Sequence, residues 1–263
     1  MKRIWLTCLA AAALAPPALG ADLKRPAAFG AFEPATAEAA KAEAAGWLRT
    51  AGKSDPATLQ QFETIWKDEG RTVLDRVVET FVLGDPAAAQ LIAEARDPFA
   101  LAPTKVPELL KDAKLPTFYK ANLALGVARA LSNRRIHEEA LETLKPFHPE
   151  QVVDPSAYLF HRAVSEHALL LKPDATKTIG RIIDDAPFAP DRYKNVSVLM
   201  LLDMQTWKDK DLSAIARKME NIERRLELAR GGPQTQKLQK EVVLRLDELI
   251  KELENKQKKP GGS

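Results

Sequence analysis

Histidine is the side chain in this sequence best suited to metal binding or proton transfer, because its ring nitrogens change protonation near neutral pH. The chain has four histidines, which are His137, His148, His161 and His167. A zinc helix of the H-E-x-x-H type needs a second histidine four residues after the first, and none of the four has one. His161 and His167 would lie about 240° apart around a helix. We therefore predict no metal site and assign these histidines to packing or to the surface.

Catalytic nucleophiles and cofactor sites also lack a sequence signature. The only cysteine, Cys8, lies in a segment that we expect to be removed, and no G-x-S-x-G sequence marks a serine nucleophile. The paired glycines of ARGGPQ (residues 229–234) follow a predicted helix and lack the spacing of a phosphate-binding loop. Haem attachment needs C-x-x-C-H, which is absent. The sequence therefore indicates no catalytic residue and no cofactor, and it favours a protein that is not an enzyme.

The first 20 residues have the three parts of an export signal. Lys2 and Arg3 form the basic start, the apolar run IWLTCLAAAALA follows, and the small residues Ala18 and Gly20 allow cleavage after Gly20. The apolar run is too short to span a membrane comfortably, although a retained anchor is the alternative. We expect an exported protein, periplasmic or extracellular, with no stable membrane insertion after cleavage.

Composition points to a helical fold and away from nucleic acid. Apolar residues make up 45% of the chain, which suffices for a core, while aromatic residues make up only 6%. Alanine, leucine, glutamate and lysine are plentiful and favour helix over strand. The formal net charge of +3 falls to +1 once Lys2 and Arg3 leave with the signal. A chain without a clear basic excess is a poor candidate for binding nucleic acid or an anionic membrane surface.

The remainder of the chain is a series of amphipathic segments separated by proline and glycine. We expect helices within residues 35–52, 54–70, 71–84, 85–96, 118–131, 136–147, 155–171, 175–186, 191–207, 211–230 and 233–255.

These segments give a simple domain organisation. Residues 1–20 are the signal peptide and 21–33 a flexible lead. Residues 34–255 form one helical-repeat domain, in which the proline-rich stretch near 97–107 could mark a subdivision, and 256–263 form a frayed tail.

Four alanines suggest a helical repeat within residues 118–187. Ala128 and Ala140 fall in consecutive predicted helices, and Ala163 and Ala175 follow them by 35 residues in each case. This pattern resembles the tetratricopeptide family, whose repeat is about 34 residues and whose small residues let two helices approach closely. The first unit lacks the family's Trp, Gly and terminal Pro, and the third pair leaves the register. The resemblance implies an all-α, solenoid-like stack of helical hairpins, here closed by a C-terminal hairpin.

The resemblance also implies a groove lined by the first helix of each hairpin. In this register the groove residues are Asn122, Leu125, Arg129, Asn133, Phe160 and His167. This set is polar and mildly cationic with one aromatic ring, which suits an extended peptide or a carboxylate. The alternative is that these residues pack against neighbouring helices or face solvent.

The stretch 229–259 is the most regularly patterned part of the chain. Seven of its apolar residues fall within one broad stripe on a helical wheel, which is the width of a core-facing helix and wider than a coiled-coil seam. We expect a closing helical hairpin in which this stripe and that of the preceding helix bury each other. A partner-binding coiled coil and a basic ligand strip are the alternatives. Residues 208–254 also resemble a segment of exported bacterial proteins, a resemblance that implies no activity.

The function that these observations favour is an exported protein-binding or scaffolding module whose partner is a protein or peptide. One alternative is an enzyme with a dispersed carboxylate and histidine site that acts on envelope polymers. The other is a structural envelope component that assembles with itself through the terminal hairpin. The sequence identifies neither the partner nor the oligomeric state.

Overall fold

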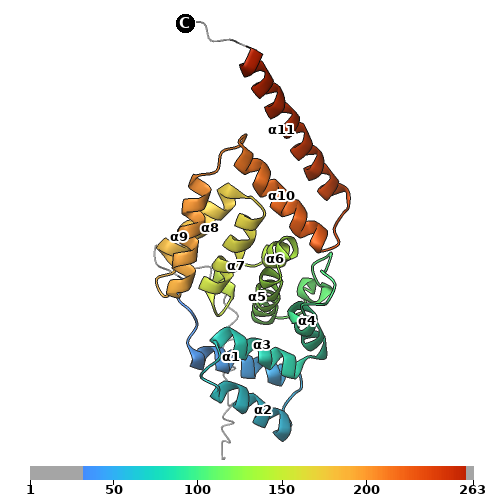
Figure 1. Cartoon of the computed structure of the whole chain (residues 1–263). Coiled ribbons are helices and arrows are strands. Elements are labelled where there is room, and N and C mark those ends of the chain that lie inside the picture. Colours follow the sequence, from blue (N-terminus) through green and yellow to red (C-terminus); the bar gives the residue numbers. More distant parts are fainter. Residues whose placement is uncertain (1–31, 259–263) are drawn as a thin grey trace, which may run out of the picture.

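The computed structural model describes residues 32–258, and within them the chain is entirely helical, with eleven α-helices, two 3₁₀ helices and no strand (Figure 1). The all-α prediction is confirmed for this range. The predicted signal peptide and most of the predicted lead lie outside the described residues. The elements are α1 (Ala37–Thr50), α2 (Pro56–Lys67), α3 (Val73–Gly84), α4 (Pro86–Arg96), η1 (Glu108–Lys111), α5 (Thr117–Asn133), α6 (His137–Leu144), η2 (Pro149–Gln151), α7 (Pro155–Ala168), α8 (Lys172–Asp185), α9 (Asp191–Gln205), α10 (Leu212–Glu227) and α11 (Pro233–Lys258).

Three helices begin with the same pair of residues, an aspartate N-cap followed by proline. Asp55, Asp85 and Asp154 each accept a hydrogen bond from a backbone N–H in the first turn of α2, α4 and α7, and a proline comes next. The aspartate satisfies a backbone donor that has no partner within the helix, and the proline occupies a position where its missing N–H costs nothing.

Three helices extend beyond their sequence-based ranges. α8 begins at Lys172, because Pro173 lies in the first turn of the helix and does not interrupt it. α5 continues to Asn133, and the turn after it is made by Arg135 in a left-handed conformation with φ 61°. α11 continues to Lys258, through residues that are good helix formers.

Helices α1 to α9 share one apolar core. Within it α5 packs against α6 and α7, and α7 packs against α8 and α9. The alanines that carry the repeat pattern, Ala128, Ala140, Ala163 and Ala175, are all completely buried. Ala102 and Val106, from the proline-rich connection, pack against the same core. Representative fully buried side chains are Leu74, Leu123, Leu144, Leu159 and Ile179, from α3, α5, α6, α7 and α8.

Helices α10 and α11 form a hairpin with its own small core of Ile215, Ile222 and Val242. The hairpin is tied to the body through charge, because Arg224 donates to both carboxylate oxygens of Glu138 at 2.8 Å. α11 extends past α10 and away from the body (Figure 1). None of the helices described is both long and apolar enough to cross a membrane.

Candidate functional site

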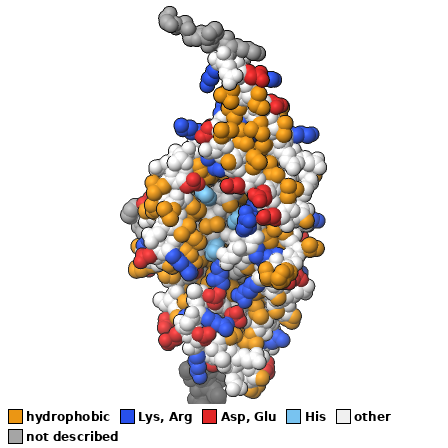
Figure 2. Space-filling model, in the orientation of Figure 1, with side chains coloured by type: hydrophobic (Ala, Val, Ile, Leu, Met, Phe, Trp, Pro, Cys, Tyr) orange, Lys and Arg blue, Asp and Glu red, His pale blue; other side chains and the backbone are white. Residues whose placement is uncertain are grey.

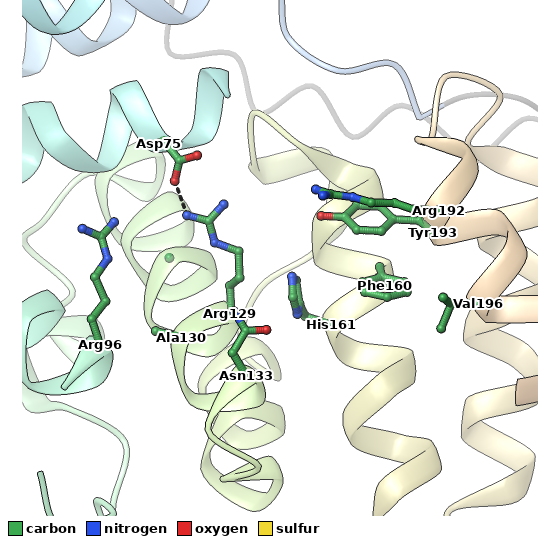
Figure 3. Close-up of a pocket in the computed structure, with 11 residues that line it drawn as sticks. Asp75, Arg96, Arg129, Ala130, Asn133, Phe160, His161, Arg192, Tyr193 and Val196 are labelled. Carbon is green, nitrogen blue, oxygen red and sulfur yellow. Dashed lines mark hydrogen bonds and ion pairs between the residues drawn. The ribbon is translucent and has the colours of Figure 1, made fainter. Parts of the chain in front are cut away.

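An open pocket of about 600 Å³ lies between α5, α7 and α9, with α3 and α4 along one side (Figure 3). α5 and α7 are the first helices of the two predicted hairpins. Arg129 of α5 lies on one side of the pocket, and Phe160 of α7 and Tyr193 of α9 lie on the other side (Figure 3). Its lining residues are Asp75, Arg96, Gly126, Arg129, Ala130, Asn133, Phe160, His161, Arg192, Tyr193 and Val196.

Three arginines give the pocket a positive charge. Arg96 comes from α4, Arg129 from α5 and Arg192 from α9, so three helices converge on the same space (Figure 3). Asp75 is the one carboxylate in the lining, and it is engaged in an ion pair with Arg129. Arg192 forms no ion pair with any residue in the described part of the chain, and it is exposed. Arg96 pairs with Glu79, outside the lining, at 3.4 Å. Arg192 is therefore the arginine whose charge is left for an anionic ligand.

Asp75 holds Arg129 in place rather than neutralising the whole site. Burial raises the pKa of Asp75, but hydrogen bonds from Arg129 and Thr72 and the charge of Arg96 outweigh this effect and leave the pKa below its ordinary value. Thr72 donates to Asp75 at 2.7 Å. The carboxylate is therefore ionised at neutral pH, and Arg129 is held on α5 with part of its guanidinium facing the pocket.

The wall opposite Arg129 is aromatic and apolar. Phe160 and Tyr193 are stacked, with ring centroids 4.1 Å apart and planes 11° from parallel. The guanidinium of Arg192 lies 5.0 Å from the centre of the Tyr193 ring, a cation–π distance that keeps the charge beside the apolar wall. Val196 is exposed one turn further along α9. A ligand that places an anionic group next to an apolar side chain would match both walls.

His161 lies between the two walls and is almost completely buried. Burial lowers its pKa to about 4, and the charges of Arg129 and Arg192 act in the same direction. The ring is therefore neutral at neutral pH, so the positive charge of the pocket comes from the arginines alone. The sequence predicts a packing or surface role for His161, and in the structure it is buried and also lines the pocket.

The six predicted groove residues divide into three groups. Arg129, Asn133 and Phe160 line the pocket together. Asn122 and Leu125 are completely buried and do not reach the pocket.

Asn122 has a structural role in the core. Its side chain accepts a hydrogen bond from the backbone N–H of Val153 at 2.8 Å and donates to the carbonyl of Phe118 at 2.8 Å. It thereby fixes α5 to the connection that leads into α7.

The remaining groove residue, His167, lines a second pocket of about 410 Å³ at the C-terminal ends of α7 and α9. Its Nε2 lies 2.9 Å from a carboxylate oxygen of Asp203, and Trp207 donates to the same oxygen at 3.0 Å. The guanidinium of Arg217 lies 5.0 Å from the centre of the Trp207 ring. This pocket brings together a histidine and a carboxylate that are 36 residues apart in the sequence.

Neither pocket has the donor set of a metal centre. In the range 32–258 no three histidine, cysteine, aspartate or glutamate side chains are grouped so that they could hold a metal ion.

No protein-family model, curated protein or solved structure matches this chain.

Proposed function

We propose that the protein is an exported binding module and that the pocket between α5, α7 and α9 holds a carboxylate-bearing peptide segment of a protein partner. The observation that carries this proposal is that Arg96, Arg129 and Arg192 line one pocket and that Arg192 has no ion-pair partner in the described part of the chain, whereas the other two are paired. Guanidinium groups bind carboxylates through paired N–H donors, and such charge-assisted hydrogen bonds are among the strongest polar contacts in proteins.

The aromatic and apolar wall of the pocket indicates which kind of anionic ligand fits. An acidic group bound by the arginines would lie beside Phe160, Tyr193 and Val196, which offer apolar surface and no charge. A peptide that ends in an apolar residue presents both features together, since its terminal carboxylate and last side chain share one residue. The neutral ring of His161 lies between the walls and can donate or accept one hydrogen bond.

We also propose that α5 to α9 are stacked hairpins of the tetratricopeptide type. The four buried alanines support this arrangement, as does the packing of α5 against both α6 and α7 and of α7 against both α8 and α9. In such a stack the first helices α5, α7 and α9 line one face, and this is the face that bears the pocket.

Export remains part of the proposal. It is supported by the basic start, apolar run and small-residue end of the first 20 residues. The described body needs no disulfide, since its stability comes from one continuous apolar core.

Binding of matched peptides tests the proposal. A pooled set of peptides that end in an apolar residue is offered as free acids and as C-terminal amides, and binding is measured by calorimetry. We expect the free acids to bind and Arg192→Ala to weaken them by about tenfold or more, the effect of losing a charged hydrogen bond. The matched control is Arg49→Ala, an exposed arginine of α1 outside the pocket. Equal binding of acids and amides, or an equal effect of both substitutions, would contradict the proposal.

A second candidate function rests on the pair formed by His167 and Asp203. A carboxylate that holds an imidazole 2.9 Å away can orient it as a general base, which is the arrangement that an enzyme acting on envelope polymers would need. The test is hydrolysis of such polymers by the wild-type protein and by Asp203→Asn. Loss of activity in a folded Asp203→Asn protein would favour this candidate, and absence of activity in the wild type would remove it.

A further inference from the structure

The hairpin of α10 and α11 carries apolar side chains on a face that no other described part of the chain covers. Figure 2 shows these side chains gathered along the hairpin where it leaves the body. On α11 the exposed fractions are 56% for Val243, 36% for Leu246, 53% for Ile250 and 59% for Leu253. On α10, Leu212 and Met219 are also exposed. Apolar residues concentrated in this way indicate a contact surface, whereas single exposed leucines are ordinary.

Only part of the apolar stripe of α11 packs against α10, and the rest is exposed. Leu238, Val242 and Leu249 belong to the small core that α11 shares with α10. The exposed set, centred on Leu246 and Ile250, lies about 80° further around the helix at 100° per residue. Helices in bundles contact two neighbours at about this angle, so α11 has one neighbour in α10 and a face suited to a second.

The pairing of the two helices shows which part of α11 lies beside α10 and which part projects beyond it. Lys218 of α10 pairs with Glu241 of α11 at 2.9 Å, and Arg245 donates to the carbonyl of Lys210 at 3.1 Å. The start of α10 therefore lies beside Arg245, and the part of α11 after Leu249 projects beyond it. That projecting part carries Ile250 and Leu253.

We propose that a second copy of the same chain covers this face, with the two α11 helices antiparallel about an axis close to Glu248. Val243 and Leu253 lie five residues to either side of Glu248, and Leu246 and Ile250 lie two residues to either side. An antiparallel pair centred there places Val243 opposite Leu253 of the second copy and Leu246 opposite Ile250 of the second copy, in every case apolar against apolar.

Charge complementarity supports a second copy as the occupant. The outer edge of the exposed seam, on the side away from α10, carries Lys240, Asp247 and Glu254 at heptad spacing. Lys240 and Glu254 lie seven residues to either side of Asp247, so the antiparallel pair brings each lysine to the glutamate of the other copy. Asp247 faces its own equivalent, the single like-charge contact along this edge.

The same arrangement covers the exposed residues of α10. The projecting end of one copy runs along the hairpin of the other, over the groove between its α10 and α11. Leu212 and Met219, which line that groove on α10, then contact the seam of the second copy. One contact thus accounts both for the projection of α11 and for the apolar exposure on α10, and it does not depend on the pocket function proposed above.

Sedimentation velocity on the wild-type protein provides the first test. We expect a monomer–dimer equilibrium, and we expect Leu246→Asp combined with Ile250→Asp to yield only monomer at unchanged helix content by circular dichroism. The matched control is Leu59→Asp, an exposed leucine of α2, which should leave the equilibrium unchanged. A wild-type protein that is monomeric up to its highest soluble concentration, or a dimer that survives the double substitution, would overturn the proposal.

Charge exchange tests the antiparallel register without touching the apolar seam. Lys240→Glu and Glu254→Lys should each raise the dimer Kd by about tenfold, because two attractive contacts become repulsive. The double exchange should restore the wild-type Kd, and so should an equimolar mixture of the two single variants, in which every Glu meets a Lys of the other chain. A dimer that neither the double exchange nor the mixture restores would show that a different register, or a different face, joins the copies.

Discussion

The body and the terminal hairpin are both helical, but they are held together by different forces. Helices α1 to α9 surround one continuous apolar core, whereas the hairpin buries only Ile215, Ile222 and Val242 between its two helices. The hairpin is fixed to the body by buried arginines that pair with Glu138. Apolar burial stabilises a region in proportion to its area, while a buried ion pair mainly specifies where two regions meet. We therefore expect the body to fold without the hairpin, which the ion pairs hold in position on it.

The largest change in stability should come from removing Glu138, the carboxylate that fixes the hairpin to the body. Burial would raise the pKa of Glu138, but the hydrogen bonds and charge of Arg224, with a further contribution from Arg225, hold it at about 2. Glu138→Ala leaves both guanidinium groups buried without their partner, which costs about 3–5 kcal/mol. We expect faster hydrogen exchange in α10 and α11 while the body stays protected.

The matched control for that substitution is Glu142→Ala, which removes an exposed glutamate paired with Lys145 on the same helix. It should leave exchange in the hairpin unchanged. Equal protection of the hairpin in both variants would show that apolar contacts, and not Glu138, fix it to the body.

Much of the body could be predicted from the sequence, because its helix signals are local. The Asp-Pro starts of α2, α4 and α7 and the glycine stop at Gly52, where φ is +74°, are each visible within a few residues. The sequence-based ranges end at 171 and resume at 175, which leaves Pro173 outside a helix, although a proline in the first turn of a helix has the same local sequence.

The hairpin contact could not be predicted in the same way. Glu138 and Arg224 are 86 residues apart, and charged residues of both signs occur on most of the helices. The prediction that the apolar stripe of α11 is buried against the preceding helix is wrong for more than half of the stripe. Leu238, Val242 and Leu249 pack in the core shared with α10, whereas the stripe residues left exposed are Val243, Leu246, Ile250 and Leu253. Only the position of α10 shows that the part centred on Leu246 and Ile250 is left exposed.

The candidate site was predicted in part. Arg129, Asn133 and Phe160 line the pocket, and all three come from the two helices that keep the repeat register. The residues of α9, Arg192 and Tyr193, were not identified, since the third pair leaves the register and a shift of one position turns a residue by about 100°.

A second comparison of the two regions uses apolar truncation. Leu131→Ala removes a fully buried side chain from the body core and should lower the free energy of unfolding of the whole body by about 2–5 kcal/mol. Ile222→Ala makes a similar change in the hairpin core, where we expect only local opening of α10 and α11. Denaturant unfolding measured by circular dichroism, combined with hydrogen exchange, separates the two outcomes. A matched loss of body stability in Ile222→Ala would mean that the regions unfold as one unit.

Acid should destabilise the body through His161. Its pKa in the folded protein is about 4, below the ordinary value of 6.5 that applies to the unfolded chain. The unfolded state therefore takes up a proton first as the pH falls, so this contribution to stability is complete above pH 6.5 and is lost between 6.5 and 4. The loss should reach about 3 kcal/mol at the acid end.

Unfolding midpoints measured across this pH range should fall less steeply in His161→Gln than in the wild type. His137, next to the hairpin, also has a pKa of about 4, because of burial and the charge of Arg224. We expect its protonation to cause the pH dependence of the unfolding midpoint that remains in His161→Gln. If the unfolding midpoint falls equally steeply with pH in wild type and in His161→Gln, groups outside the pocket cause the acid sensitivity.

The smallest change in stability should come from removing one helix cap, and the same kind of cap can be removed in each region. Thr36 caps α1 in the body and Asp211 caps α10 in the hairpin, each by accepting a backbone N–H of the first turn. Replacing either with alanine removes about 1 kcal/mol from its helix. In the body the loss should appear in global unfolding, because α1 contributes the buried residues Ala44 and Leu48 to the common core. In the hairpin the small core cannot couple α10 to the body, so Asp211→Ala should change exchange in α10 and leave the global midpoint in place. A fall in the global midpoint for Asp211→Ala, equal to that for Thr36→Ala, would show that the charged contact at Glu138 transmits stability as effectively as the apolar core does.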